Sequence, residues 1–436
     1  MAGRSPTRLW LTFGAILVLI ALTFPAVAGA KVKDDSGLYV PKPNPDARAQ
    51  ITDLYRSGEK ADAELIESLV ETPQAVWFTK GTPDEVSRSV EATVRRAKGT
   101  VPVLVAYNIP FRDCAQFSAG GATNVGDYLA WIDGFAAGIG DAEAIVILEP
   151  DGLGIIPWYT PVGAGGPEWC QPAEADPATA ASDRFFMLNA AIERLNEQPN
   201  VSVYLDGTHS AWLNVGDNAS RLIRAGVADA AGFYLNVSNY QYTENSLHYG
   251  TWISSCIAYV TSVSPGDFAG CPNQYWNGGP LPSLLAQLYG EWNGVALSNY
   301  GEWSDTTTVQ DLNTSAISLR YANMLGAIEP TTHFVIDTSR NGLGPWAPPA
   351  GVYPDAQDWC NPPDRGAGLR PTLNTGVALV DAYLWVKIPG ESDGECTRGL
   401  GATGVEDPEW GQVDPAAGLW FPDMALQLAR NAVPGL

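Results

Sequence analysis

Seven short apolar runs recur along the chain, with helix-like patterns between them. The runs are nearly continuous rather than alternating, as expected for strands that are covered on both faces of a parallel sheet. They lie at 75–78, 101–107, 144–149, 201–205, 232–235, 333–336 and 383–388. Seven strands alternating with helices favour a distorted parallel α/β barrel similar to a TIM barrel, with an open doubly wound sheet as the alternative.

The helical patterns carry recognisable start signals. Thr82 offers a capping hydroxyl, proline follows in the first turn, and Glu85 lies near the positive end of the helix dipole. Val86, Val90 and Val94 then recur every fourth residue, which gives this helix one apolar face. Further helices are predicted at 128–137, 182–197, 219–228, 312–327 and 419–432.

The chain is expected to form a single domain over 49–436, because no linker or internal repeat divides it. Residues 31–48 contain several prolines and are predicted to be a mobile lead-in. Residues 238–310 interrupt the alternation and are rich in Tyr, Trp, Asn and Gly. An insertion of that length in a compact domain is usually functional, for example as a lid over a substrate.

The first thirty residues predict export. Arg4 and Arg8 precede an apolar stretch at 9–24, and small residues follow it, which is the layout of a secretory signal peptide over 1–30. A membrane anchor is the alternative, but a spanning helix usually needs about 20 apolar residues. We therefore expect a secreted, extracellular protein that has no membrane contact after cleavage.

Composition excludes several classes of function. The chain has 48 acidic and 25 basic residues, and a net charge of −23 repels phosphate backbones, so nucleic acid is not expected as a partner. The three histidines (209, 248 and 333) lack HExxH spacing and there is no CxxC, so no zinc site or other cofactor is predicted. The GxGxxG match at 399–404 has no preceding strand and no following helix.

All six cysteines lie after the proposed signal segment. An even number in a secreted chain favours disulfides, although the pairing does not follow from the count. Pairing in sequential order is favoured, because each bond then clamps one local excursion of the chain.

Four aspartates stand just beyond strand-like or apolar runs. They are Asp113, Asp151, Asp206 and Asp393. Because the carboxyl ends of parallel strands meet at one edge of a barrel, these acids are predicted to converge on a single cleft. Paired carboxylates are the groups that hydrolysis of a glycosidic bond requires.

A single aspartate after a strand has a simpler explanation, because it often caps the next helix. Asp337 and Asp381 fit that structural role. Four acids in four separate loops are harder to explain as independent caps.

Aromatic residues support a carbohydrate site. Trp77, Trp212 and Trp359 lie at or beyond strand ends, whereas Trp131 and Trp385 lie within regular elements and are assigned to the core. Flat aromatic faces pack on sugar rings while carboxylates and amides bind the hydroxyls.

Several motifs resemble those of glycoside hydrolase family 6, the cellulases that cleave β-1,4-glucan with inversion. They are AYNIPFRDC (106–114), ILEPDGL (147–153), YLDGTHSAWL (204–213), DTSRNG (337–342), DWCNPPDRG (358–366) and LWVKIPGESDG (384–394). The resemblance implies a distorted seven-stranded barrel as the catalytic domain. It also implies disulfides Cys114–Cys170 and Cys360–Cys396, which leaves Cys256–Cys271 to close a loop in the insertion.

The resemblance also implies catalytic roles. Asp151 is similar to the general acid, and Asp113 is a nearby charge that raises its pKa. Asp393 matches the residue usually assigned as general base, with transfer along a water chain towards Asp113 as the alternative. Tyr107 is similar to a tyrosine that crowds the reacting sugar, and Asp206 resembles an acid of the same subsite.

Substrate-binding positions carry over as well. They are Trp77, Thr79, Asp206, His209, Trp212, Asn236, Trp359, Lys387 and Glu391. Ser118 is the candidate for a serine that helps to hold the attacking water.

The expected substrate is cellulose, other β-1,4-glucan chains or cello-oligosaccharides, bound by a monomer. The ample loop material favours a cellobiohydrolase over an endoglucanase with an open cleft. A non-catalytic glycan-binding protein and a retaining glycosidase are the remaining alternatives.

Overall fold

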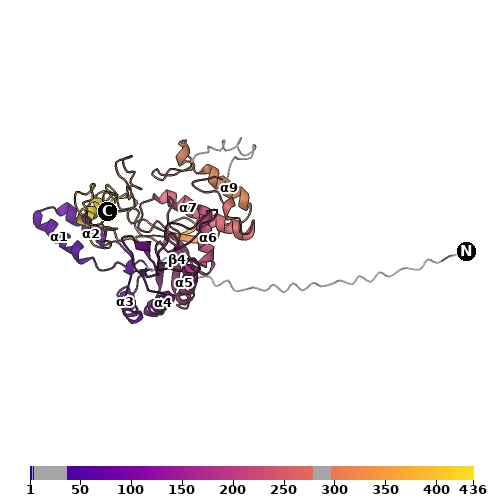
Figure 1. The fold of residues 1–436 in the computed structure, drawn as a ribbon, viewed down its shortest axis with the longest axis horizontal. Coiled ribbons are helices and arrows are strands. Elements are labelled where there is room, and N and C mark those ends of the chain that lie inside the picture. The colour runs from indigo at the N-terminus through magenta and orange to yellow at the C-terminus, as the bar shows by residue number, and fades with distance from the viewer. Residues whose placement is uncertain (2, 4–36, 278–295) are drawn as a thin grey trace.

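Seven strands form one curled parallel sheet in the computed structural model, which describes residues 1, 3, 37–277 and 296–436 (Figure 1). Each strand pairs in parallel with the next one along the chain. The strands are β1 (Val76–Phe78), β2 (Val103–Ala106), β3 (Ala144–Leu148), β4 (Val201–Asp206), β5 (Gly232–Leu235), β6 (His333–Asp337) and β7 (Val380–Leu384). The predicted single-domain, seven-stranded α/β barrel is therefore confirmed.

The predicted helices are present, each within a few residues of its expected bounds. They are α3 (Pro83–Arg96), α4 (Val125–Ile139), α5 (Ala180–Asn196), α6 (Val215–Arg224), α9 (Ser315–Leu325) and α10 (Pro422–Arg430). The expected cap of α3 is a complete capping box, in which Glu85 N–H donates to the Thr82 hydroxyl and the Glu85 carboxylate accepts the Thr82 N–H. Helices α3, α4 and α5 pack in succession along one flank of the sheet (Figure 1).

Three further helices had not been predicted from the sequence. They are α1 (Pro45–Ser57), α2 (Lys60–Val70) and α7 (Thr243–Ser262). Helix α7 lies in the 238–310 insertion and is buried over much of its circumference, so its sequence lacks a single apolar stripe. Residues 278–295 of the insertion lie outside the described part.

The strands separate two layers of core. Val103, Val105 and Ile147 point into the barrel, whereas Leu104 and Val146 point outwards and pack under the helices. This alternation follows from the two-residue period of a strand. Full burial of one such side chain contributes about 1.5–3 kcal/mol to stability.

The sheet is open between β1 and β7, and helices that precede β1 and follow β7 cover the seam. Ala75 N–H donates to Trp385 O across it at 2.9 Å, and Trp77 Nε1 donates to Val386 O at 2.8 Å. Helices α1, α2 and α10 pack together beside the seam (Figure 1). Trp420 joins their apolar cluster.

The lead-in at 31–48 differs from expectation in its described part, 37–48. Tyr39 N–H donates to Val101 O at 2.9 Å, and Val101 N–H donates to Gly37 O at 2.8 Å. Pro45 then begins α1, for which Asn44 is the N-cap. Residues 37–48 are thus anchored to the barrel, while 31–36 and nearly all of the proposed signal segment lie outside the described residues.

Strand β7 ends earlier than the apolar run predicted. The Asp337 carboxylate accepts N–H groups from Val386 (3.2 Å) and Lys387 (2.9 Å), which diverts the chain towards the cleft. Asp337 is therefore structural, but it binds the segment after β7 and does not cap a helix as expected. Asp381 does not cap a helix either: it lies within β7, and its carboxylate accepts a hydrogen bond from Tyr204 (2.9 Å).

Three disulfides join the cysteines in sequential order. They are Cys114–Cys170, Cys256–Cys271 and Cys360–Cys396, as predicted. Within the described residues, no helix has the length and apolarity needed to cross a bilayer.

Candidate active site

A cavity of about 680 Å³ lies at the carboxyl ends of the strands. The segments that follow all seven strands contribute to its wall. Taken in strand order, examples are Thr79, Asp113, Asp151, His209, Tyr240, Pro345 and Asp393. The predicted convergence of Asp113, Asp151 and Asp393 on one cavity is thus observed.

Asp151 lies on a strained loop directly after β3. Its φ is 61° and that of Glu149 is 51°, both in the left-handed region that is uncommon for residues other than glycine. Burial raises the pKa of Asp151 well above its usual range, and the negative charges of Asp206, Asp113 and Asp393 raise it further. The carboxyl group is therefore held in the protonated form that a general acid needs.

Asp206 supports this loop from outside the cavity lining. Its Oδ2 accepts N–H groups from Leu153 (3.0 Å) and Gly154 (2.9 Å), and its Oδ1 accepts the Thr208 N–H (2.8 Å). With 2% of its surface exposed, Asp206 has no face available for a sugar. Asp206 is therefore not the substrate contact that the sequence predicts. It holds the loop that carries Asp151, and its negative charge raises the pKa of Asp151.

Asn236 also lies beneath the cavity rather than in its wall. Its side-chain nitrogen donates to Asp337 O (2.9 Å), and its side-chain oxygen accepts the Gln241 N–H (3.0 Å). The residue is fully buried, so the geometry gives it a structural role in place of the predicted sugar contact. The other predicted binding residues line the cavity: Trp77, Thr79, His209, Trp212, Trp359, Lys387 and Glu391.

Asp393 is surrounded by donors. Arg340 Nη1 lies 2.9 Å from Oδ2 and Lys387 Nζ lies 3.2 Å from Oδ1. The Tyr240 hydroxyl (3.3 Å) and the Asn361 N–H (3.0 Å) also donate to Oδ2. Burial acts to raise the pKa of Asp393, but the two cations and these hydrogen bonds outweigh it and lower the pKa, so the group stays ionised.

Asp113 is the third acid of the cavity. Burial raises its pKa to about 6, an effect that the Ser118 N–H and Arg112 partly offset. The Ser118 N–H donates to Asp113 Oδ2 at 2.6 Å, which places Ser118 beside this carboxylate in the cavity wall.

Tyr107 lies between Trp77 and Arg112 on one side of the cleft. The rings of Tyr107 and Trp77 meet edge to face with centroids 5.4 Å apart, and the Arg112 guanidinium lies 4.4 Å above the Tyr107 ring. Arg112 also donates to Thr79 O (3.0 Å) and Ser118 O (2.8 Å). Arg112 thus ties three segments of the wall together.

The sequence interpretation missed four contributors to the site. Arg112, Arg340 and Asn361 lie inside the quoted FRDC, DTSRNG and DWCNPPDRG motifs. Arg340 and Asn361 bind Asp393 from 53 and 32 residues away, and Arg112 binds Thr79 from 33 residues away in addition to nearer partners. Nothing in the sequence distinguishes Tyr240 from the other tyrosines of the 238–310 insertion.

An acid held protonated, a second acid held ionised in the same cleft, and exposed aromatic rings define a glycoside hydrolase. Residues 33–275 and 286–432 match the sequence profile of Glycosyl hydrolases family 6. The chain belongs to this family, whose members are inverting cellulases.

The chain is similar both to proteins named as endoglucanases and to proteins named as cellobiohydrolases. Endoglucanase A of Thermobispora bispora is 30% identical over 97% of the chain and 67% of that protein. Endoglucanase 1 of Streptomyces halstedii is 30% identical over 96% of the chain and 97% of that protein. A probable 1,4-beta-D-glucan cellobiohydrolase C of Aspergillus niger is 30% identical over 83% of the chain and 69% of that protein.

Solved structures agree with the fold. The endoglucanase Cel6 of Mycobacterium tuberculosis, in complex with methyl-cellobiosyl-4-deoxy-4-thio-beta-D-cellobioside, superposes with a TM-score of 0.58 at 29% identity and covers 91% of this chain and 97% of that chain. Cellobiohydrolase II (Cel6A) of Humicola insolens, with glucose and cellotetraose, gives 0.59 at 22% identity over 92% and 99% of the two chains.

Proposed function

We propose that this chain is a secreted cellobiohydrolase that releases cellobiose from the ends of β-1,4-glucan chains. The observation that carries the proposal is the contrast between Asp151 and Asp393, which line one cavity with pKa values moved in opposite directions. Three disulfides support an oxidising, extracellular environment.

In this proposal Asp151 protonates the departing glycosidic oxygen. Water attacks the opposite face of the sugar, and its proton passes towards Asp113. A carboxylate accepts protons best when its pKa lies near the working pH, so Asp113, at about 6, suits this task better than Asp393. Asp393 then supplies a fixed negative charge that stabilises the positively charged transition state.

Loop material near the cleft supports attack at chain ends. Ala417 and Gly418, from the long stretch after Asp393, line the cavity. Tyr300, from the insertion, also lines it and donates to Asp358 at 2.9 Å. An endoglucanase is the alternative, because relatives of both kinds are similar to this chain.

Viscosity and reducing ends measured together on carboxymethylcellulose distinguish the two modes. Release from chain ends produces reducing sugar with little loss of viscosity. A rapid fall in viscosity per bond cut would replace the cellobiohydrolase proposal with the endoglucanase.

The variant Asp151→Asn tests the acid. We expect kcat on unactivated cello-oligosaccharides to fall by about 10²–10⁴-fold, since a general acid typically contributes that much. A substrate with a dinitrophenolate leaving group needs no protonation, and its hydrolysis should fall far less. Near-normal turnover of cello-oligosaccharides by the variant would remove Asp151 from the acid role.

Two alternatives have their own tests. A glycan-binding protein without activity would bind cello-oligosaccharides and release no product. A retaining enzyme would give the β-anomer first, whereas inversion gives the α-anomer, and proton NMR of the initial product separates the two.

A further inference from the structure

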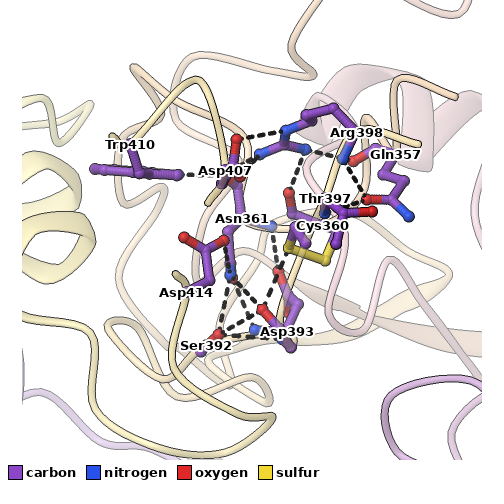
Figure 2. Close-up of a disulfide and its surroundings, with 12 residues drawn as sticks. Gln357, Cys360, Asn361, Ser392, Asp393, Thr397, Arg398, Asp407, Trp410 and Asp414 are labelled. Atoms are coloured by element: carbon purple, nitrogen blue, oxygen red, sulfur yellow. Dashed lines mark hydrogen bonds and ion pairs between the residues drawn. A yellow bond between two sulfur atoms is a disulfide. The ribbon is translucent and has the colours of Figure 1, made fainter. Parts of the chain in front are cut away.

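A buried carboxyl group, Asp414, lies beside Asn361, the residue that also binds Asp393 (Figure 2). It is 2% exposed. Its Oδ2 accepts a hydrogen bond from Asn361 Nδ2 at 2.8 Å, whereas Oδ1 is buried without a partner. An unpaired buried carboxylate oxygen is costly, whereas a protonated one can donate a hydrogen bond.

Asp407 is the acceptor that faces Asp414, and a side-chain hydrogen bond between the two acids contributes to the raised pKa of Asp414. Both carboxyl groups lie beside the Cys396 sulfur. Asp407 already accepts bonds from Arg398 Nε (3.1 Å), Arg398 Nη2 (2.7 Å) and the Glu409 N–H (2.9 Å). Its own negative charge is therefore well compensated.

The charges of this buried cluster balance only if one of its two carboxyl groups is protonated. Arg398 is the buried cation of this cluster, and two carboxyl groups face it. A metal ion does not suit the site, because the Cys396 sulfur is bonded to Cys360 and Arg398 already neutralises Asp407. Burial raises the pKa of Asp414 to about 7, and the Asp407 charge adds to this effect.

Asn361 connects Asp414 to Asp393. The Asn361 N–H donates to Asp393 Oδ2 (3.0 Å), and its side-chain oxygen accepts the Asp393 N–H (2.8 Å). Its side-chain nitrogen points the other way, towards Asp414 and Gly394 O (3.0 Å) (Figure 2). A flipped amide would set nitrogen against the Asp393 N–H and oxygen against the Asp414 oxygen.

We propose that Asp414 is a neutral buried acid that fixes the orientation of Asn361, and thereby the position of the Asp393 carboxylate, for hydrolysis. Its hydroxyl donates to Asp407 while its other oxygen accepts from Asn361, so every polar atom of the pair is satisfied. The inference rests on the role of Asp393 in the proposed function. The charged groups around Asp414 are Asp407 and Arg398, and Asp393 with its cations Arg340 and Lys387 lies beyond Asn361.

Two substitutions separate a neutral hydrogen-bonding role from a charged or purely space-filling one. Asp414→Asn keeps one donor for Asp407 and one acceptor for Asn361, whereas Asp414→Leu keeps the size and loses both. We expect Asp414→Asn to retain kcat on cello-oligosaccharides within about twofold at pH 5. Asp414→Leu should lose about 10- to 100-fold in kcat, the cost of a misplaced catalytic group, with KM nearly unchanged. Asp381→Asn, the same chemical change far from the cleft, should leave both constants unchanged.

Thermal unfolding at several pH values tests whether Asp414 is protonated in the folded state. A pKa of about 7 in the folded state, above the usual 3.8, means that wild-type stability declines as pH rises from about 4 to about 7. Asp414→Asn lacks this decline. The Tm of the variant minus the Tm of the wild type should therefore increase as pH rises over the same range. A Tm difference that does not change with pH, or a kcat of Asp414→Asn as low as that of Asp414→Leu, would overturn the proposal.

The Tm result does not depend on the catalytic assignment. If Asp393→Asn remained active, the role of Asp393 in the proposed function would fail, yet the pH-dependent Tm difference would still report the proton on Asp414. If Asp393→Asn is inactive and that Tm difference is absent, the inference about Asp414 fails alone.

Discussion

Arg340 and Asp393 form an ion pair at 2.9 Å in which the arginine side chain is fully buried. Lys387 adds a second cation at 3.2 Å. Asp151 has acidic neighbours instead, namely Asp206 and Asp113. One cavity therefore holds a protonated and an ionised carboxyl group, because the charges behind its walls differ.

Loss of Arg340 should move the acid limb of the pH–activity profile. With Arg340→Gln, the lowered pKa of Asp393 rises, since an adjacent cation typically accounts for about 1–3 units. Activity needs both Asp113, whose pKa is about 6, and Asp393 in the ionised form, so the acid limb of kcat/KM should shift to higher pH once the raised pKa of Asp393 approaches that of Asp113. Arg430→Gln, which breaks an exposed pair with Asp62, should leave the limb in place. An unmoved limb in Arg340→Gln would mean that Asp393 does not control it.

Asp206→Asn should shift the alkaline limb of the pH–activity profile. Removing this negative charge lowers the pKa of Asp151, and activity that needs protonated Asp151 is lost as pH rises through that pKa. The alkaline limb of kcat/KM should therefore move to lower pH. An alkaline limb that stays in place would contradict the coupling between these two acids.

Gly154→Ala should weaken substrate binding through Trp212. A Cβ at position 154 would lie 2.6 Å from Trp212 Cη2 and 3.0 Å from Thr208 Cγ2, so the indole must move. Because an aromatic contact is worth about 0.5–1.5 kcal/mol, KM for cello-oligosaccharides should rise by about 2- to 12-fold. Gly166→Ala is the matched control, since its Cβ would meet no atom within 4 Å. Equal KM values for both variants would mean that Trp212 does not hold substrate.

The Cys360–Cys396 disulfide should support both stability and activity. It closes a segment with a sequence separation of 36, for which chain entropy predicts about 4 kcal/mol of unfolding free energy. Asn361 is next to one cysteine and Asp393 lies close to the other. Serine at both positions should therefore lower the urea midpoint and also reduce kcat in the absence of urea.

Serine at Cys256 and Cys271 provides the comparison. That bond spans a separation of 15 and should contribute about 3 kcal/mol. We expect its loss to lower stability with a smaller effect on kcat. A larger loss of kcat from this pair would contradict the link between Cys360–Cys396 and the position of Asp393.

Sequence reasoning identified the barrel because buried parallel strands produce continuous apolar runs. It missed α1 because that helix is polar over most of its surface, and α7 because contacts on several sides replace its apolar stripe. Strand β7 ended early because Asp337 binds the backbone beyond it, a contact across 50 residues of sequence.

The site was predictable as a set of acids but not as a set of roles. Asp151 and Asp206 both follow or end apolar strands, yet one faces the cavity and the other binds backbone N–H groups. Which way a carboxylate points depends on loops that arrive from elsewhere in the chain. The pairing of Arg340 with Asp393 could not be predicted for the same reason, because the two residues are 53 positions apart and the folded loops bring them together.

The seam between β1 and β7 links completion of the enzyme to the order of its synthesis. Helix α10, which follows all seven strands along the chain, packs on α2, which precedes them. Trp385 and Trp420 enter the same cluster from late in the chain. A nascent chain therefore cannot cover the seam until α10 has emerged from the ribosome, and removal of α10 uncovers the apolar side of the seam.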